Sequence, residues 1–291
     1  MDIEGISGAA TVALTSTLVF VLIAKSWQLI NRTVGSNSRF PSSIMREAAQ
    51  RFRDEFDRLS RSQSTYLSAG LVFVVLFVAA YILNAKDLFI GFPHWQLSVL
   101  LAALLVGALM ALFRLARTVL IRHRIKLRRD ANMAIGHQLQ RLATGVGRTY
   151  HDVETSSGII DHIIVGQGGA YAVTVVARPS AKNGTVTLNS NELQFEPGGH
   201  VHSIVASSAR IASIEREFRR LLDHRVRVRS VLAVPGWNVP AQGSDEHLLV
   251  NEKNLAMLGG WKDQADYLLN EDVDALHKLL TSRCALNAKK K

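Results

Sequence analysis

The chain has 291 residues, of which 48% are hydrophobic, and a formal net charge of +10 at neutral pH. Its mean hydropathy is +0.12, which indicates a membrane portion beside one globular domain. The single cysteine, Cys284, excludes a disulfide framework and a cysteine-based zinc site. The excess of cations is compatible with nucleic acid or anionic lipid, and its distribution along the chain decides between them.

Three apolar stretches in the first half are long enough to cross a bilayer as helices. They contain no charged side chain and occupy residues 6–24, 66–83 and 95–113. The first follows Asp2 and Glu4 rather than a basic segment, so we interpret it as a retained anchor and not a signal peptide. We expect one transmembrane helix in residues 1–30 and a transmembrane helical hairpin in 66–121.

Cationic residues gather on one side of these spans. Eight Lys and Arg residues lie between the first and second spans, and seven follow the third within residues 114–129. The N-terminal tail and the 84–94 hairpin contain only Lys86. The positive-inside rule therefore predicts an N-terminus outside and a cytoplasmic C-terminal domain. The expected location is the bacterial inner (cytoplasmic) membrane, with membrane lipid as one partner.

Residues 31–65 form a basic segment with an amphipathic pattern. The apolar positions at helical spacing are Ile44, Ala48, Phe52, Phe56 and Leu59. We expect a helix that lies on the membrane or packs on the domain, with its arginines available to acidic headgroups. A nucleic-acid-binding helix is the alternative. The basic stretch 122–131 is interpreted as a linker, and its cations are likewise expected to meet acidic headgroups before any nucleic acid.

The domain expected at 132–250 mixes helix and strand patterns. Strands are predicted at 148–155, 158–166, 170–177, 184–188, 192–196, 226–236 and 247–250. Helices are predicted at 132–145 and 203–224, and residues 251–291 are expected to form a helical extension. This order predicts an α/β fold with helices packed against a sheet.

The stretch GIIDHIIVGQGGAYAV, residues 158–173, resembles the signature of NERD, the nuclease-related domain. Members of that family read G-N-I-D-H-I-V-V-G-P-x-G-V-F-V-I-E-T-K. The resemblance covers about residues 132 to 250. It implies a mixed sheet of the restriction-endonuclease-like, PD-(D/E)XK type, and Mg²⁺-dependent cleavage of phosphodiesters.

The resemblance can be carried over residue by residue. Asp161 matches the first metal-binding aspartate, and His162 matches the histidine beside it. The second acid of the family falls on Thr174 and the lysine on Val176. Threonine is a weak neutral ligand for a hard cation, and valine neither binds metal nor carries charge. We therefore expect a pseudoenzyme: the fold is retained, phosphodiesters are not cleaved and no cofactor is bound.

An active nuclease is the alternative. Asp152 and Glu154 lie on the neighbouring strand and share a face by alternation, so they are candidates to hold Mg²⁺ together with Asp161. The remaining histidines of this region are expected to face solvent: His151, His200, His202 and His224.

Arginines concentrate on the predicted 203–224 helix and the strand after it. The candidates for contacts with nucleic-acid phosphates are Arg210, Arg216, Arg219, Arg220, Arg227 and Arg229. The alternative is a solvated helix face that pairs with Glu215 and Glu217. Three functions remain open: a membrane protein that binds DNA, RNA or a nucleoprotein without cleaving it, an active nuclease, and a membrane scaffold that binds a protein partner.

Overall fold

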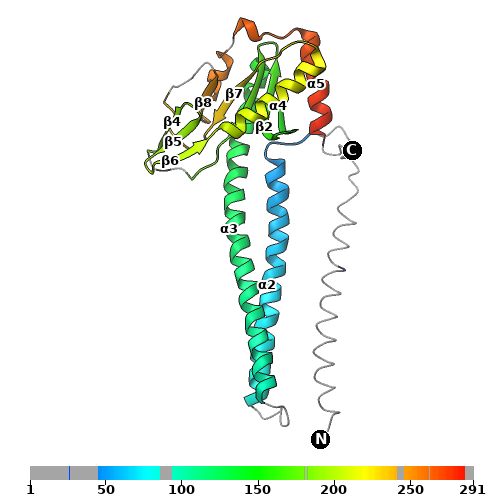
Figure 1. Ribbon diagram of the computed structural model, residues 1–291, viewed down its shortest axis with the longest axis vertical. Coiled ribbons are helices and arrows are strands. Elements are labelled where there is room, and N and C mark those ends of the chain that lie inside the picture. The colour runs from blue at the N-terminus through cyan, green and yellow to red at the C-terminus, as the bar shows by residue number, and fades with distance from the viewer. Residues whose placement is uncertain are drawn as a thin grey trace. The chain divides into compact units, whose positions relative to one another are not determined.

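The computed structural model describes residue 26 and residues 45–85, 94–179, 181, 183–240, 246–261 and 263–285 (Figure 1). The expected first span, residues 6–24, lies outside these ranges, as do residues 86–93 of the hairpin. Residues from Met45 onward belong to one unit, which contains both the long helices and the sheet.

Two of the described helices, α2 (Gln50–Ala85) and α3 (His94–Val146), are long and apolar enough to cross a membrane. Helix α2 joins the basic amphipathic segment to the second apolar stretch without a break. Helix α3 contains the third stretch, the expected linker 122–131 and the helix expected after it. Residues 108–135 contain no glycine or proline to interrupt the helix. The linker is therefore continuous helix, not a separating loop.

Helices α2 and α3 pack closely because small residues lie at their contact (Figure 1). A Cβ added at Gly107 would lie 2.8 Å from the ring of Phe73, and one at Gly70 would lie 3.7 Å from the Ala111 side chain. Nearer the sheet, the buried side chain of Phe52 packs with Ile125. The two helices thus reach the domain as a packed pair.

The main sheet is mixed and five-stranded, in the order β1-β2-β3-β7-β8. Its strands are β1 (Arg148–Thr155), β2 (Gly158–Gly166), β3 (Gly169–Val175), β7 (Val228–Ala233) and β8 (His247–Val250). The first three pair antiparallel, whereas β3, β7 and β8 run parallel. The α/β fold with a mixed sheet is confirmed.

A second, antiparallel sheet contains β4 (Thr185–Asn189), β5 (Glu192–Glu196) and β6 (His200–Ser203). Strand β6 was not predicted, because two glycines precede it and the sequence reads as a loop. It forms by pairing with β5, where His202 lies opposite Leu193.

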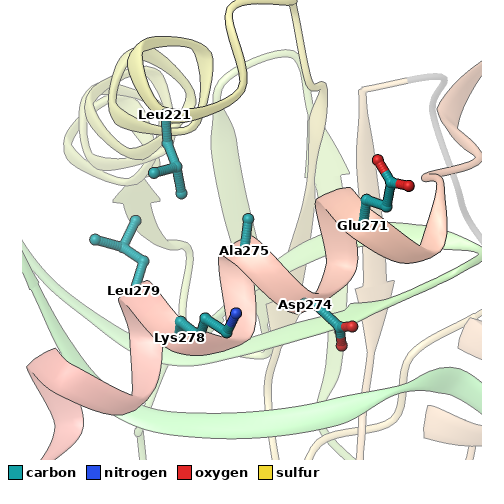
Figure 2. A pocket seen from close by; sticks show the side chains of 6 residues that line it. All are labelled: Leu221, Glu271, Asp274, Ala275, Lys278 and Leu279. Atoms are coloured by element: carbon teal, nitrogen blue, oxygen red, sulfur yellow. The ribbon is translucent and has the colours of Figure 1, made fainter.

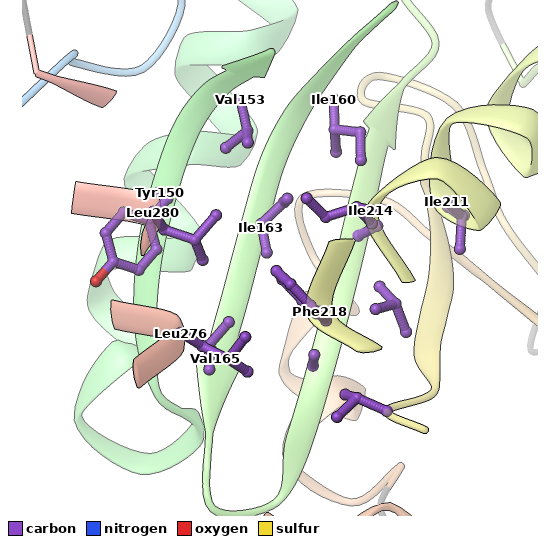
Figure 3. Close-up of a cluster of buried hydrophobic side chains, with 14 of the residues drawn as sticks. Tyr150, Val153, Ile160, Ile163, Val165, Ile211, Ile214, Phe218, Leu276 and Leu280 are labelled. Carbon is purple, nitrogen blue, oxygen red and sulfur yellow. The ribbon is translucent and has the colours of Figure 1, made fainter. Parts of the chain in front are cut away.

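Helices cover both faces of the main sheet. Helix α4 (Val205–Leu222) and helix α5 (Asn270–Cys284) pack on one face, where Phe218 and Leu276 meet Ile163 (Figure 3). The other face receives Ile135 and Leu139 of α3, together with the short helix η1 (Leu255–Gly259). A second short helix, η2 (Gln264–Asp266), precedes α5. Helix α5 is therefore part of the domain core, whereas the sequence predicted an extension.

Candidate functional site

Strands β1 and β2 share an irregularity that gathers four polar residues. Side chains on one face of a strand normally recur every second residue. Here, residues of one core cluster are three apart on each strand, as in Tyr150 and Val153, and in Ile160 and Ile163. The ladder omits Asp152 and Asp161, and Asp152 has a φ of 50°. These two aspartates occupy the break, and His151 and His162, which pair with each other in the ladder, lie directly beside it.

The carboxylate of Asp161 is buried, and both of its oxygens have partners. Oδ2 accepts a hydrogen bond of 2.9 Å from the backbone N–H of Val175, and Oδ1 lies 3.3 Å from the guanidinium of Arg51. Burial raises the pKa of Asp161, while the Val175 N–H and the charge of Arg51 act in the opposite direction. Arg51 thus provides the positive charge that a buried carboxylate requires.

The other two acids of the predicted metal site lie apart from each other. Asp152 is buried and accepts a hydrogen bond of 3.0 Å from the backbone N–H of Arg51. The side chain of Glu154 is 54% exposed and lies 3.2 Å from the Arg46 guanidinium. The positive φ at Asp152 breaks the alternation that was expected to place these two acids on one face. Among the residues that the structure describes, no three histidine, cysteine or acidic side chains are placed to hold a metal ion.

Residues 45–51, which we call the tether, connect the start of α2 to the sheet. The backbone N–H of Arg46 donates to the Cys284 carbonyl at 2.8 Å, and its guanidinium donates to the Asp152 carbonyl at 3.0 Å. The segment before α2 therefore packs on the sheet, whereas the apolar residues Phe52 and Phe56 of the expected amphipathic helix pack with Ile125 of α3. The contact of Arg51 with Asp161 joins residues 110 positions apart, and no local signal in the sequence indicates it.

The positions of the family's second acid and lysine are buried. Thr174 precedes the Val175 N–H that binds Asp161, and Val176 packs with Val186 and Leu193 of the second sheet. Mg²⁺ requires several free oxygen ligands. The oxygens of Asp161 already accept from N–H donors, Thr174 is neutral and Val176 is apolar. The residues present therefore do not fit a magnesium site of the expected type.

His151 and His162 form a buried pair. Their Nδ1 atoms lie 2.8 Å apart, so one imidazole donates and the other accepts. Burial lowers the pKa of His151 to about 4 and holds the pKa of His162 well below its ordinary value. The expectation that His151 faces solvent is therefore wrong. His200 and His224 are exposed, as predicted, whereas His202 is half-buried.

We expect this pair to make the chain sensitive to mild acid. The histidines have a pKa near 6.5 when unfolded and a lower one when folded, so the unfolded chain binds more protons between pH 6.5 and about 4. Stability should therefore fall over that window, by on the order of 1 to 2 kcal/mol for His151. The measurement is the unfolding temperature of the full chain in detergent from pH 7.5 to 4.5.

His151→Gln should flatten this pH dependence, and His200→Gln, at an exposed position of β6, should leave it unchanged. The same acid slope in wild type and in His151→Gln would contradict the assignment.

The six arginines predicted to contact nucleic acid fall into two groups. Arg229 is buried, forms an ion pair with Asp266 and stacks on the Trp261 ring at 4.8 Å. Arg210 is half-buried and donates to the Ile159 carbonyl at 2.9 Å. Both side chains are held by partners within the fold. Arg229 was predicted to contact phosphate at a surface, and it is buried instead. The exposed members are Arg216, Arg219, Arg220 and Arg227.

Three of these exposed arginines form a surface at the end of α4, which we call the α4 arginine cluster. Arg216, Arg219 and Arg220, with Asp223, line an open hollow of about 340 Å³. The acids of the same helix have other partners: Glu215 accepts a hydrogen bond from the Val228 N–H, and Glu217 pairs with Arg283. Within the described ranges, none of the three guanidinium groups has a carboxylate partner. The alternative, in which Glu215 and Glu217 pair with arginines of the same helix, is not seen at these three side chains.

A second hollow, between α4 and α5, bounds this basic surface. It measures about 460 Å³, and Figure 2 shows Leu221 of α4 facing Leu279 of α5 across it. Glu271 and Asp274 lie at its edge. Lys278 lines the same hollow, where the two carboxylates outnumber this one cation, so phosphate is less favoured there than on the α4 arginine cluster.

Comparisons with protein-family models, with curated proteins and with solved structures find no match to this chain. The nuclease-related family therefore remains an expectation that rests on the residues around Asp161.

Proposed function

We propose that the chain is an integral membrane protein whose cytoplasmic, nuclease-like domain binds nucleic acid without cleaving it. The proposal places it in the bacterial inner membrane, with the N-terminus outside. Two long apolar helices that continue into the domain support the membrane placement. The observation that carries the binding function is the α4 arginine cluster, with three exposed guanidinium groups that form no ion pair with any acid in the described part of the chain.

Guanidinium groups suit this role because they bind phosphate oxygens with a planar pair of donors. Arg216 and Arg220 are four residues apart, so they lie on one side of α4, and Arg219 extends the same surface. A ligand with regularly spaced phosphates can contact all three at once. Sequence-independent affinity of this kind comes mainly from counterion release and depends strongly on salt.

The absence of cleavage is supported by the environment of Asp161. Metal-assisted hydrolysis needs a cation that holds water and phosphate together. In this fold the positive charge beside Asp161 is the guanidinium of Arg51. A guanidinium group cannot coordinate and activate a water molecule as a metal ion does. Thr174 and Val176 add neither a carboxylate nor a cation.

The test is nucleic-acid binding by the full chain in nanodiscs of phosphatidylcholine, followed by fluorescence anisotropy over a salt series. We expect binding of duplex DNA or RNA that weakens steeply with salt. The variant Arg216→Gln/Arg219→Gln/Arg220→Gln should lower the slope of log affinity against log salt by about 2 to 3, because three phosphate contacts are lost. Arg141→Gln/Lys253→Gln/Lys278→Gln removes equal charge from other exposed positions and should change the slope little.

An equal effect of both triple variants would show that only net charge matters and would refute the assigned surface. No binding at low salt would leave the scaffold role as the better account. Addition of Mg²⁺ to the same samples tests the nuclease alternative. Cleavage that disappears in Asp161→Ala would overturn the non-cleaving assignment.

A further inference from the structure

A third hollow lies where the domain meets the cytoplasmic part of α3. It measures about 530 Å³ and is lined on one side by six residues of α3 between His123 and Asp130, and on the other by Ala177 and Pro179 after β3. It is separate from the α4 arginine cluster and from the Asp161 site, and the proposed nucleic-acid binding makes no use of it.

The cations of this hollow differ from their neighbours on the same helix. Arg122 and Arg129 stack on the Phe56 ring of α2 at 4.3 and 4.9 Å, so they belong to the contact between the two helices. Three other cations of α3 line the hollow: Arg124, Lys126 and Arg128. Their side chains are exposed and have no acidic partner in the described part of the chain.

The acid in the wall does not neutralise these three cations. Asp130 is bound by Arg129, whose guanidinium donates to Asp130 Oδ1 at 2.8 Å. The charge of Arg128 also reaches His202: burial lowers the pKa of His202, and Arg178, Arg210 and Arg128 lower it further. Several positive groups therefore converge on this side of the domain.

The hollow begins just after the exposed apolar residues Leu120 and Ile121 of α3, which themselves follow the exposed Arg114 and Arg117. Leu120 is 67% exposed and Ile121 is 37% exposed, and the first lining residue, His123, follows two positions later. Arg124 lies only about 5 Å along the helix from Ile121 at 1.5 Å per residue. When α3 spans a bilayer with the apolar stretch 95–113 in the hydrocarbon, Arg124 lies about 16 Å along the helix from the end of that stretch, at the outer edge of the headgroup region, where anionic lipid attracts basic side chains.

We propose that the hollow binds the phosphate of an anionic phospholipid headgroup. Arg124 and Arg128, four residues apart on α3, supply paired N–H donors to the phosphate oxygens, and Lys126 adds a point charge at the rim. Leu127 and Pro179 provide an apolar wall for the glycerol end of the lipid. The inference rests on the membrane-spanning role of α3 and is independent of nucleic-acid binding.

The test is lipid retention by the full chain in detergent, measured by native mass spectrometry during titration with phosphatidylglycerol or with phosphatidylcholine. We expect wild type to retain phosphatidylglycerol in preference. Arg124→Gln/Arg128→Gln should weaken its apparent affinity about tenfold or more, since each basic residue near the surface contributes to anionic-lipid binding. Arg219→Gln/Arg220→Gln, on the α4 arginine cluster, should match wild type.

A conservative variant separates charge from folding. Arg124→Lys/Arg128→Lys should keep most of the preference for phosphatidylglycerol. Equal retention of the two lipids by wild type, or equal weakening in the Gln variant and the α4 control, would overturn the proposal. Loss of lipid in the Lys variant together with a lowered unfolding temperature would mean that these side chains serve the fold, which also refutes it.

A final arm distinguishes lipid from soluble phosphate. Inorganic phosphate or glycerophosphoglycerol, added at the same concentrations, should displace little phosphatidylglycerol. Displacement at equal concentration would assign the hollow to a soluble phosphate compound instead of lipid. No nucleic acid is present, so failure of this test and failure of the proposed function remain distinguishable. Extraction of membranes with alkaline carbonate checks the span itself.

Discussion

Arg51→Met should destabilise the full chain by about 1 to 3 kcal/mol, because it leaves the buried carboxylate of Asp161 without its cation. The larger loss of stability that follows when a fully buried ion pair is broken is not expected here, since the Arg51 side chain is 34% exposed and water screens its charge. Methionine keeps much of the length of arginine and its apolar contact with the helix, so the change isolates the guanidinium. Thermal unfolding in detergent measures the effect.

The pH dependence of this loss identifies its cause. The folded-state pKa of Asp161 is already raised by burial, and removal of Arg51 takes away a charge that lowers it. The penalty is present where Asp161 is ionised, above its folded-state pKa. It should shrink as the pH falls through that pKa and the carboxyl becomes neutral. A loss of stability that stays constant with pH would point to packing instead.

Two variants serve as controls for Arg51→Met. Arg53→Met removes the neighbouring guanidinium, whose partner Glu47 has a 66% exposed side chain, and should cost less than about 1 kcal/mol. Asp161→Asn should recover part of the loss in the Arg51→Met background, because a neutral amide needs no cation. If Arg53→Met costs as much as Arg51→Met, the special role of Arg51 is refuted.

The sequence predicts the elements of this fold better than it predicts the site. The alternating and the continuously apolar stretches of sequence form strands of the main sheet, as predicted, because burial on one or two faces of a sheet produces such patterns. The break at Asp152 does not follow from those runs. A positive φ at an aspartate depends on the tether, whose Arg51 N–H binds its carboxylate. The prediction of a shared face for Asp152 and Glu154 therefore failed.

Contacts distant in sequence account for the other differences. Arg229 resembles its exposed neighbours in the sequence, and only the fold brings Asp266 and Trp261 to it. The continuity of α3 is different, because the lack of glycine and proline through residues 108–135 was available as a signal. The basic stretch 122–131 was interpreted as a linker between the helical hairpin and the domain. The structure has no break in the helix there.

Grafting the family's missing groups onto this domain should fail for a physical reason. Val176 is 6% exposed and belongs to an apolar cluster with Val186, Leu193 and Val234, so Val176→Lys buries an ammonium group without a partner. We expect a loss of about 3 kcal/mol or more, since an unpaired buried charge must be desolvated or neutralised. Val176→Met, of similar length without the charge, should cost clearly less.

The second half of the graft adds to the problem. Thr174→Glu places a carboxylate next to Val175, whose N–H binds Asp161, and a second negative charge there raises the pKa of both acids. Arg51 already pairs with Asp161, so its one positive charge cannot balance two carboxylates. Thr174→Glu/Val176→Lys should therefore unfold at lower temperature than wild type and should not cleave DNA with Mg²⁺. A double variant that is as stable as wild type and cleaves would instead show that the cluster around Val176 opens for lysine. Arg51 would then be a replaceable occupant of a metal site, and only the two substituted residues would separate this domain from a working nuclease.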